Sequence, residues 1–118
     1  MKKQLICAFV VLSAFVYPGD KLLGRWQTKP DAKGAVTAVV FKEDNTFEAF
    51  VNRKAFATAE YTYQDSVLSF TDNGCDGARG TYKVIFFSND DSIRFQPIAD
   101  TCIGRRNGIS RMVLGRVK

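Results

Sequence analysis

The chain has 118 residues, of which 46% are hydrophobic, and its 17 Lys and Arg residues outnumber 12 Asp and Glu residues for a net charge of +5. It contains no histidine, which removes most serine and cysteine hydrolase arrangements, the usual zinc sites and most proton relays. We therefore expect no enzyme, no catalytic residue, no metal site and no cofactor.

The first 19 residues predict a secretory signal peptide. Lys2 and Lys3 precede an apolar run from Leu5 to Val16, which is shorter than the roughly 20 residues that a transmembrane helix needs. A retained anchor is the alternative, because the cleavage site is poor. We expect an exported protein, periplasmic or secreted, whose mature domain spans residues 20–118 and has no transmembrane segment.

The mature chain is one small domain that would benefit from a crosslink. Without Lys2 and Lys3, 15 of the 17 basic residues remain against 12 acidic ones, a net charge of +3, which is too mild to indicate a nucleic-acid partner. A domain of roughly 99 residues buries only about 60–68% of its unfolded surface. Cys75 and Cys102 are its two cysteines, and an even count in an exported chain favours a disulfide. A free thiol and an intermolecular bond are the alternatives.

Short alternating runs separated by turn residues follow the N-terminal segment and predict an all-β domain. We expect no amphipathic helical segment of useful length after residue 25. The eight predicted strands are Gly24–Lys29, Ala35–Lys42, Thr46–Val51, Phe56–Gln64, Val67–Thr71, Gly80–Phe87, Ile93–Ile98 and Ile109–Val117.

The connections between these strands alternate in length. "EDN", "DS" and "SNDD" are tight, whereas "PDAKG", "NRKA", "DNGCDGA" and "ADTCIGRRNG" are longer. Every second connection of a meander lies at the same end of the sheet, so the longer loops share one end. This alternation predicts an eight-stranded antiparallel up-and-down barrel with one open mouth. Its interior is either filled by side chains or holds one small ligand.

Alternation along each strand also predicts which side chains face the interior. Phe50, Ile85, Phe87 and Val113 break the pattern and are expected to point outward. The expected interior positions are Trp26, Val39, Phe41, Phe47, Ala49, Val51, Ala57, Ala59, Tyr61, Tyr63, Leu68, Phe70, Tyr82, Val84, Phe86, Ile93, Phe95, Met112 and Leu114.

The stretch "LLGRWQ" opens the first strand with Gly24-x-Trp26, and "FKEDNTF", "GTYKV" and "DTCIGR" follow later. Together with the eight-strand meander, these motifs resemble the lipocalin/calycin superfamily, in particular small exported bacterial lipocalin-like proteins. The chain is much shorter than the larger lipocalins and is expected to lack their C-terminal helix.

The resemblance implies that an arginine near the end of the last strand packs on the tryptophan, and the matching residue is Arg116. The first and last strands are neighbours in a closed barrel, and Arg116 shares the inward parity of Leu114. We therefore expect Trp26 and Arg116 to close the barrel. A plain core tryptophan and a ligand contact are the alternatives for Trp26.

The longer loops carry more basic than acidic residues, which predicts a positive mouth that concentrates anions. An anionic amphiphile, such as a fatty-acid-like ligand, would place its head group at Arg53, Arg79 or Arg105 and its acyl chain among the interior aromatic residues. The inward Tyr61, Tyr63 and Tyr82 need hydrogen-bond partners if buried and are further candidate ligand contacts. For the basic loops at the mouth, the alternative is an ordinary solvated surface.

These features favour a lipocalin-like barrel that binds a small hydrophobic or anionic amphiphilic ligand. The alternative is a filled-barrel interaction module, such as an inhibitor or an envelope-assembly subunit, because nine large aromatic side chains could fill a short barrel. A connected interior void of about 300 Å³ or more would favour the ligand-binding function. The sequence identifies no protein partner.

Overall fold

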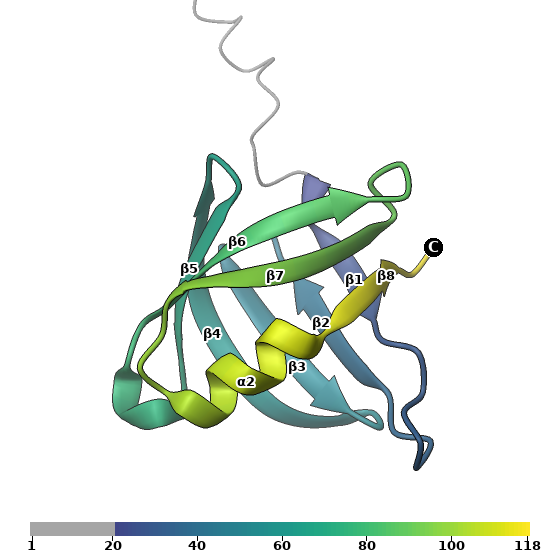
Figure 1. Ribbon diagram of the computed structural model, residues 1–118, viewed down its shortest axis with the longest axis horizontal. Helices are drawn as coiled ribbons and strands as arrows, with labels where there is room; N and C mark the ends of the chain where they lie inside the picture. The colour runs from purple at the N-terminus through teal and green to yellow at the C-terminus, as the bar shows by residue number, and fades with distance from the viewer. Residues whose placement is uncertain (1–20) are drawn as a thin grey trace, which may run out of the picture.

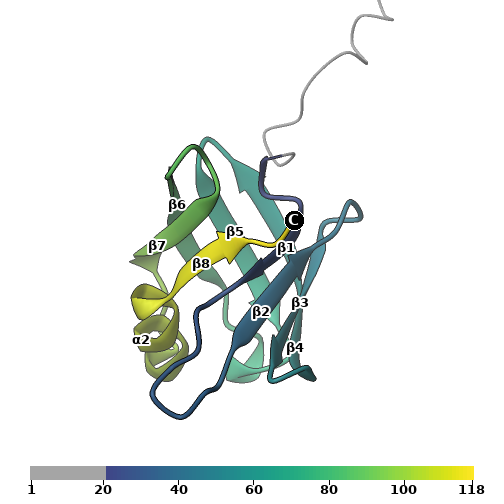
Figure 2. The ribbon, with the colours of Figure 1, turned by 90° about the vertical axis from the view of Figure 1, so that its right-hand side faces the viewer.

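The protein is a closed antiparallel barrel of eight strands in sequence order, as Figure 1 and Figure 2 show for the computed structural model, which describes residues 21–118. Each strand pairs with its neighbours in the chain, and the first strand pairs with the last. The prediction of an all-β, up-and-down barrel is therefore confirmed. The strands are β1 (Gly24–Gln27), β2 (Thr37–Phe41), β3 (Thr46–Val51), β4 (Lys54–Gln64), β5 (Val67–Asp72), β6 (Gly80–Phe87), β7 (Ser92–Ala99) and β8 (Val113–Arg116).

The predicted signal peptide lies outside the described residues. Within residues 21–118, no helix is both long and apolar enough to cross a bilayer.

The segment before the last strand differs from the prediction. Instead of a loop running into a strand at Ile109, the chain forms the helix α2 (Ile103–Arg111), and β8 begins only at Val113. The predicted strand Ile109–Val117 is therefore wrong at its start, and no helix was predicted at this position. Gly104 and Gly108 are poor helix formers, and no helical residue is fully buried, so the segment has no amphipathic pattern. Tertiary contacts of the helix override this weak local preference.

The interior matches the predicted faces closely. Fourteen of the predicted interior side chains are buried, and Ala57, Tyr63, Phe86 and Met112 pack partly buried against them. Val51 is the exception and is 37% exposed, because it is the last residue of β3 and borders the turn into β4 at the end of the barrel. The buried fourteen are Trp26, Val39, Phe41, Phe47, Ala49, Ala59, Tyr61, Leu68, Phe70, Tyr82, Val84, Ile93, Phe95 and Leu114.

The longer connections lie at one end of the barrel, the lower end in Figure 1, which we call the mouth end. The β1–β2 connection, the β5–β6 connection with the short helix η2 (Cys75–Gly77), and the start of α2 all lie there. The predicted long β3–β4 loop is instead a two-residue turn, since Asn52 and Arg53 both have positive φ, at 51° and 72°. Positive φ at both central residues is the type I′ geometry that suits a twisted hairpin.

Trp26 closes the opposite end, which carries the tight turns. Its side chain is fully buried, and its indole Nε1 donates to the Leu22 carbonyl at 2.8 Å. The Arg116 guanidinium lies 4.2 Å from the centre of the indole ring. It also donates to the carbonyls of Lys21 at 2.9 Å and Asp90 at 3.1 Å. The first and last strands, β1 and β8, are thus joined by these side chains as well as by backbone pairing.

We expect Arg116→Ala to lower the free energy of unfolding by about 1–3 kcal/mol, because the variant loses the cation–π contact and the hydrogen bonds to two carbonyls. Urea unfolding followed by the fluorescence of Trp26 measures the change. Arg94→Ala, on the exposed face of β7, is the matched control and should change stability by no more than about 0.5 kcal/mol. Equal effects of the two substitutions would contradict a closing role for Arg116.

Candidate functional site

A half-open cavity of about 530 Å³ lies inside the barrel at the mouth end. Strand β8 pairs with β7 only over Ser92–Arg94, and beyond this point α2 packs beside β7 (Figure 2) and forms one wall of the cavity. Most of the lining is apolar, with Val39, Phe41, Phe47, Ala49, Phe56, Ala57, Leu68, Phe70, Phe95, Ile109 and Met112. The barrel is therefore packed at one end and hollow at the other.

Two glycines of α2 face the cavity. Gly104 and Gly108 are four residues apart and so lie on one helix face, and both line the cavity. A Cβ atom added at either position would meet nothing within 4 Å. Both glycines therefore leave open space where they line the cavity, and we expect a larger side chain at Gly108, the less exposed of the two, to reduce the cavity volume.

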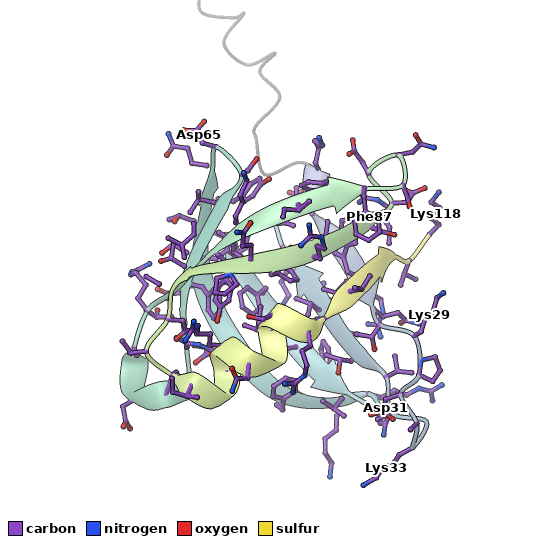
Figure 3. All side chains as sticks on the ribbon, in the orientation of Figure 1. Lys29, Asp31, Lys33, Asp65, Phe87 and Lys118 are labelled. Carbon is purple, nitrogen blue, oxygen red and sulfur yellow. A yellow bond between two sulfur atoms is a disulfide. The ribbon has the colours of Figure 1, made fainter. Side chains whose placement is uncertain are left out.

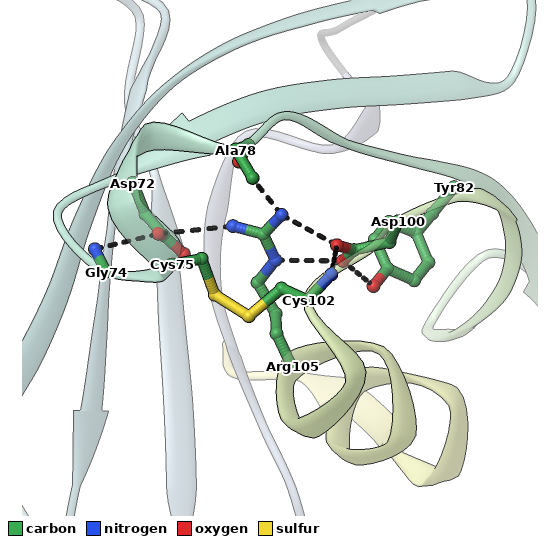
Figure 4. The surroundings of a disulfide bond; sticks show 8 residues. All are labelled: Asp72, Gly74, Cys75, Ala78, Tyr82, Asp100, Cys102 and Arg105. Atoms are coloured by element: carbon green, nitrogen blue, oxygen red, sulfur yellow. Dashed lines mark hydrogen bonds and ion pairs between the residues drawn. A yellow bond between two sulfur atoms is a disulfide. The ribbon is translucent and has the colours of Figure 1, made fainter.

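One wall of the cavity is charged and centres on Arg105 (Figure 4). Its guanidinium donates to both carboxylate oxygens of Asp100, from Nε to Oδ2 and from Nη2 to Oδ1, each at 2.8 Å. Nη2 also donates to the Ala78 carbonyl at 3.0 Å, and Nη1 donates to Asp72 at 3.2 Å. Only 8% of the Arg105 side chain is exposed. Arg105 thus joins the first turn of α2 to the ends of β5 and β7.

Asp100 is the acceptor on which this cluster converges. Besides Arg105, the Tyr82 hydroxyl and the Cys102 amide donate to its carboxylate. Burial alone would raise the pKa of Asp100, but these donors outweigh burial and lower the pKa to about 2. Burial and the hydrogen bond to Asp100 raise the pKa of Tyr82 far above its usual value. Tyr82 therefore stays a protonated donor and Asp100 a carboxylate at neutral pH.

Gly80, at the start of β6, makes room for the cluster. A Cβ atom at this position would lie 2.9 Å from Asp100 Oδ2 and 3.0 Å from Arg105 Nη2, which is closer than real Cβ contacts. The glycine therefore lets the backbone of β6 approach the ion pair directly.

The predicted disulfide between Cys75 and Cys102 is confirmed. It joins η2 to the residue that precedes α2, beside the Arg105 cluster (Figure 4). The start of the helix is thus held by one covalent and several polar links.

The three arginines predicted to bind a head group lie in different environments. Arg105 lines the cavity, but its charge is paired with Asp100 and Asp72. Arg79 is exposed on the outer face of the barrel, where it donates to Ser69 Oγ at 3.1 Å. Arg53 is exposed in the β3–β4 turn and does not line the cavity. None of the three presents an unpaired cation to the cavity.

Of the three tyrosines predicted as ligand contacts, only Tyr82 lines the cavity. Tyr61 packs against Phe41, with ring centres 5.3 Å apart, and its hydroxyl faces the Lys42 carbonyl at the tight-turn end. Tyr63 lies on the same strand, beside Ser66 of the β4–β5 turn. The structure therefore does not bring these three hydroxyl groups together.

Both ends of the barrel carry exposed charges of both signs. Lys29, Asp31 and Lys33 lie on the β1–β2 connection at the mouth end, whereas Asp65 and Lys118 lie at the other end (Figure 3). The acidic residues of the β6–β7 turn are largely neutralised, because Asp90 pairs with Lys21 and Asp91 pairs with Lys118. The tight-turn end is therefore less negative than its turn residues suggest.

The described residues contain no group of three or more His, Cys, Asp or Glu side chains placed to hold a metal ion. No family model, no curated protein and no solved structure matched the chain. The candidate site is consequently defined by its geometry alone.

We expect the protein to lose stability in acid as Asp100 takes up a proton. The folded pKa of about 2 lies below the ordinary aspartate value of 3.8, so this contribution to stability is present above pH 4 and is lost as pH falls through 2. The loss amounts to about 2 kcal/mol. Urea unfolding at a series of pH values should show this slope in the wild type and in Asp65→Asn, whereas Asp100→Asn should be less stable at neutral pH and flatter in acid. A wild-type slope in Asp100→Asn would contradict the assignment.

The disulfide joins residues that are 27 positions apart in the sequence. For a loop of this length the chain-entropy model gives a stabilisation of about 3–4 kcal/mol, so replacing both Cys75 and Cys102 by Ser should lower the free energy of unfolding by this amount. The barrel should still fold, because Arg105 also holds the start of α2. Intact mass should rise by two hydrogens when the wild type is reduced. Wild-type stability in the double variant, or a mass that reduction does not change, would rule out a stabilising crosslink.

Proposed function

We propose that this protein is an exported carrier or sensor barrel that binds a small hydrophobic ligand in the cavity at its mouth end. The observation that supports this function most directly is the cavity itself. Its volume of about 530 Å³ falls within the roughly 300–1,000 Å³ of small-molecule sites, and its lining is mainly aromatic and aliphatic. Burial of apolar surface would supply most of the binding free energy.

The composition of α2 also supports a binding role for the cavity. A glycine inside a helix costs about 1 kcal/mol relative to alanine, and α2 has two of them facing the open space. Alanine at either position would favour the helix without a clash. The two glycines therefore leave open space at the cavity at the expense of helix stability.

The alternative of a filled-barrel interaction module is less well supported. The aromatic side chains that could have filled the interior line the cavity at the mouth end or pack at the closed end, with Trp26 and Phe86 6.2 Å apart between ring centres. One observation favours a protein partner: Ile98, Ile103 and Val113 are more than half exposed near the junctions of α2. A partner at this surface is compatible with a ligand inside the barrel.

The proposal assigns no catalytic role to the charged wall. The Tyr82 hydroxyl and the Arg105 guanidinium are committed to Asp100. A tyrosine with a raised pKa and a carboxylate with a lowered pKa are poorly suited to proton transfer near neutral pH. We therefore assign these groups to positioning α2 against the barrel.

We expect the protein to bind decanol, a neutral apolar probe, and Gly108→Leu to weaken this binding by roughly tenfold or more, because the leucine side chain would occupy cavity volume. Isothermal titration calorimetry and native mass spectrometry measure the affinity and stoichiometry. Trp26 does not line the cavity, so its fluorescence is used to follow unfolding and not to measure decanol binding.

Asn107→Leu is the matched control, since it adds the same side chain to an exposed position of α2 and should leave decanol binding unchanged. Native mass spectrometry of protein purified from its own host would reveal a retained ligand. Absence of decanol binding in the wild type, with no retained ligand, would argue against the proposed function.

A further inference from the structure

The polar side chains that line the cavity differ in whether they keep a hydrogen-bond donor or acceptor free for a ligand. The Tyr82 hydroxyl donates to Asp100, and Asn73 Oδ1 accepts from the Thr58 amide at 3.0 Å. Asp72 Oδ1 accepts from Arg105 Nη1 at 3.2 Å and from the Gly74 amide at 3.0 Å. Within residues 21–118, no hydrogen bond reaches the other oxygen of Asp72, Oδ2. This carboxylate therefore keeps unused acceptor capacity at the cavity wall.

Asp72 is placed at the cavity by strand geometry. It continues the inward positions Leu68 and Phe70 along β5, and all three side chains line the cavity. Only 11% of its side chain is exposed. A ligand whose alkyl chain lies beside Phe70 would thus place its head group close to this carboxylate.

The Arg105 cluster as a whole carries an excess of one negative charge, and of its charged groups only the Asp72 carboxylate and the Arg105 guanidinium line the cavity. Asp72 and Asp100 face a single cation, Arg105, and these side chains are 11%, 0% and 8% exposed. Charges at sites of low solvent exposure interact more strongly than exposed ones. The basic residues of the mouth end are solvated, and salt screens them over about 8–10 Å. The buried wall therefore dominates selection inside the cavity.

We infer that the cavity selects an amphiphile with a cationic, hydrogen-bond-donating head group, such as a primary alkylamine, and that Asp72 receives this group. The inference deepens the proposed function and rests on it, because it names the class of ligand that the same cavity takes. The alkyl chain lies among the apolar side chains, and the ammonium group donates to Asp72 Oδ2.

A carboxylate head group is disfavoured at the same place. Arg105 uses its Nε hydrogen, one Nη1 hydrogen and both Nη2 hydrogens within the cluster. Its remaining hydrogen lies on Nη1, the nitrogen that already donates to Asp72. An anion that accepted this hydrogen would lie beside the Asp72 carboxylate and be repelled by it.

The test compares decylamine, decanol and decanoate with the wild-type protein at neutral pH, below their micelle concentrations. The three probes share one alkyl chain and differ in head group. Calorimetric titration should show decylammonium binding roughly 10- to 100-fold more tightly than decanoate, as expected for a hydrogen bond to a charged group. Decanoate binding as tightly as decylammonium would overturn the inference while leaving the proposed function intact, provided that decanol binds. Failure of all three probes to bind would overturn both.

Asp72→Asn should remove the preference for decylammonium over decanoate, while the amide keeps an oxygen that can accept from Arg105 and Gly74. Asp76→Asn is the matched control: it makes the same change of charge in η2, on the connection that follows β5, at an exposed position outside the cavity lining, and should keep the preference. If Asp72→Asn still binds decylammonium more tightly than decanoate, the preference must come from a group other than Asp72. The wild-type comparison needs no variant, so it decides the question even if Asp72→Asn does not fold.

Discussion

The buried ion pair between Arg105 and Asp100 organises the half of the barrel that contains the cavity. Arg105 lies in the first turn of α2 and Asp100 follows β7, so their paired hydrogen bonds fix the helix against the sheet. A glycine-containing helix of nine residues would be marginal in isolation. Because this helix forms one wall of the cavity, the position of the wall depends on the ion pair. Removing one partner would leave a buried charge, which typically costs about 3–5 kcal/mol.

The two ends of the barrel use arginine for opposite purposes. Arg116 lies over Trp26 and bonds to backbone carbonyls, which seals an end already filled by aromatic side chains. Arg105 instead holds a helix at the barrel wall where β8 has not yet begun. The short β8 makes this possible, since pairing along the whole of β7 would have brought a strand, and its interior side chains, into the space that α2 now borders. A closed end and a hollow end therefore follow from where the last strand starts.

Local patterns were sufficient to predict the barrel but not its charged wall. Period-two alternation identified nearly all of the interior side chains, and the bounds of β3 and β6 matched the structure. Val51 has the inward parity but ends β3, and alternation alone does not show where a strand leaves the packed part of the barrel. Helix α2 was missed because its two glycines and its lack of buried residues remove the helical signal. Asp72 was assigned to the "DNGCDGA" loop, although it continues the inward parity of Leu68 and Phe70, and its pairing with Arg105, 33 residues away, depends on tertiary structure.

The cavity and the unused acceptor of Asp72 both oppose stability. Voids lose dispersion contacts that a packed interior would have, and a poorly solvated carboxylate with one unbonded oxygen carries a desolvation cost. The disulfide between Cys75 and Cys102 lies beside this region and constrains the unfolded chain, so it offsets part of these costs without filling the cavity. Crosslinking next to a hollow, partly unsatisfied site is physically coherent if the site must remain open for a ligand. In a barrel that served only as a rigid surface, larger residues at Gly104 and Gly108 would have stabilised the fold more simply.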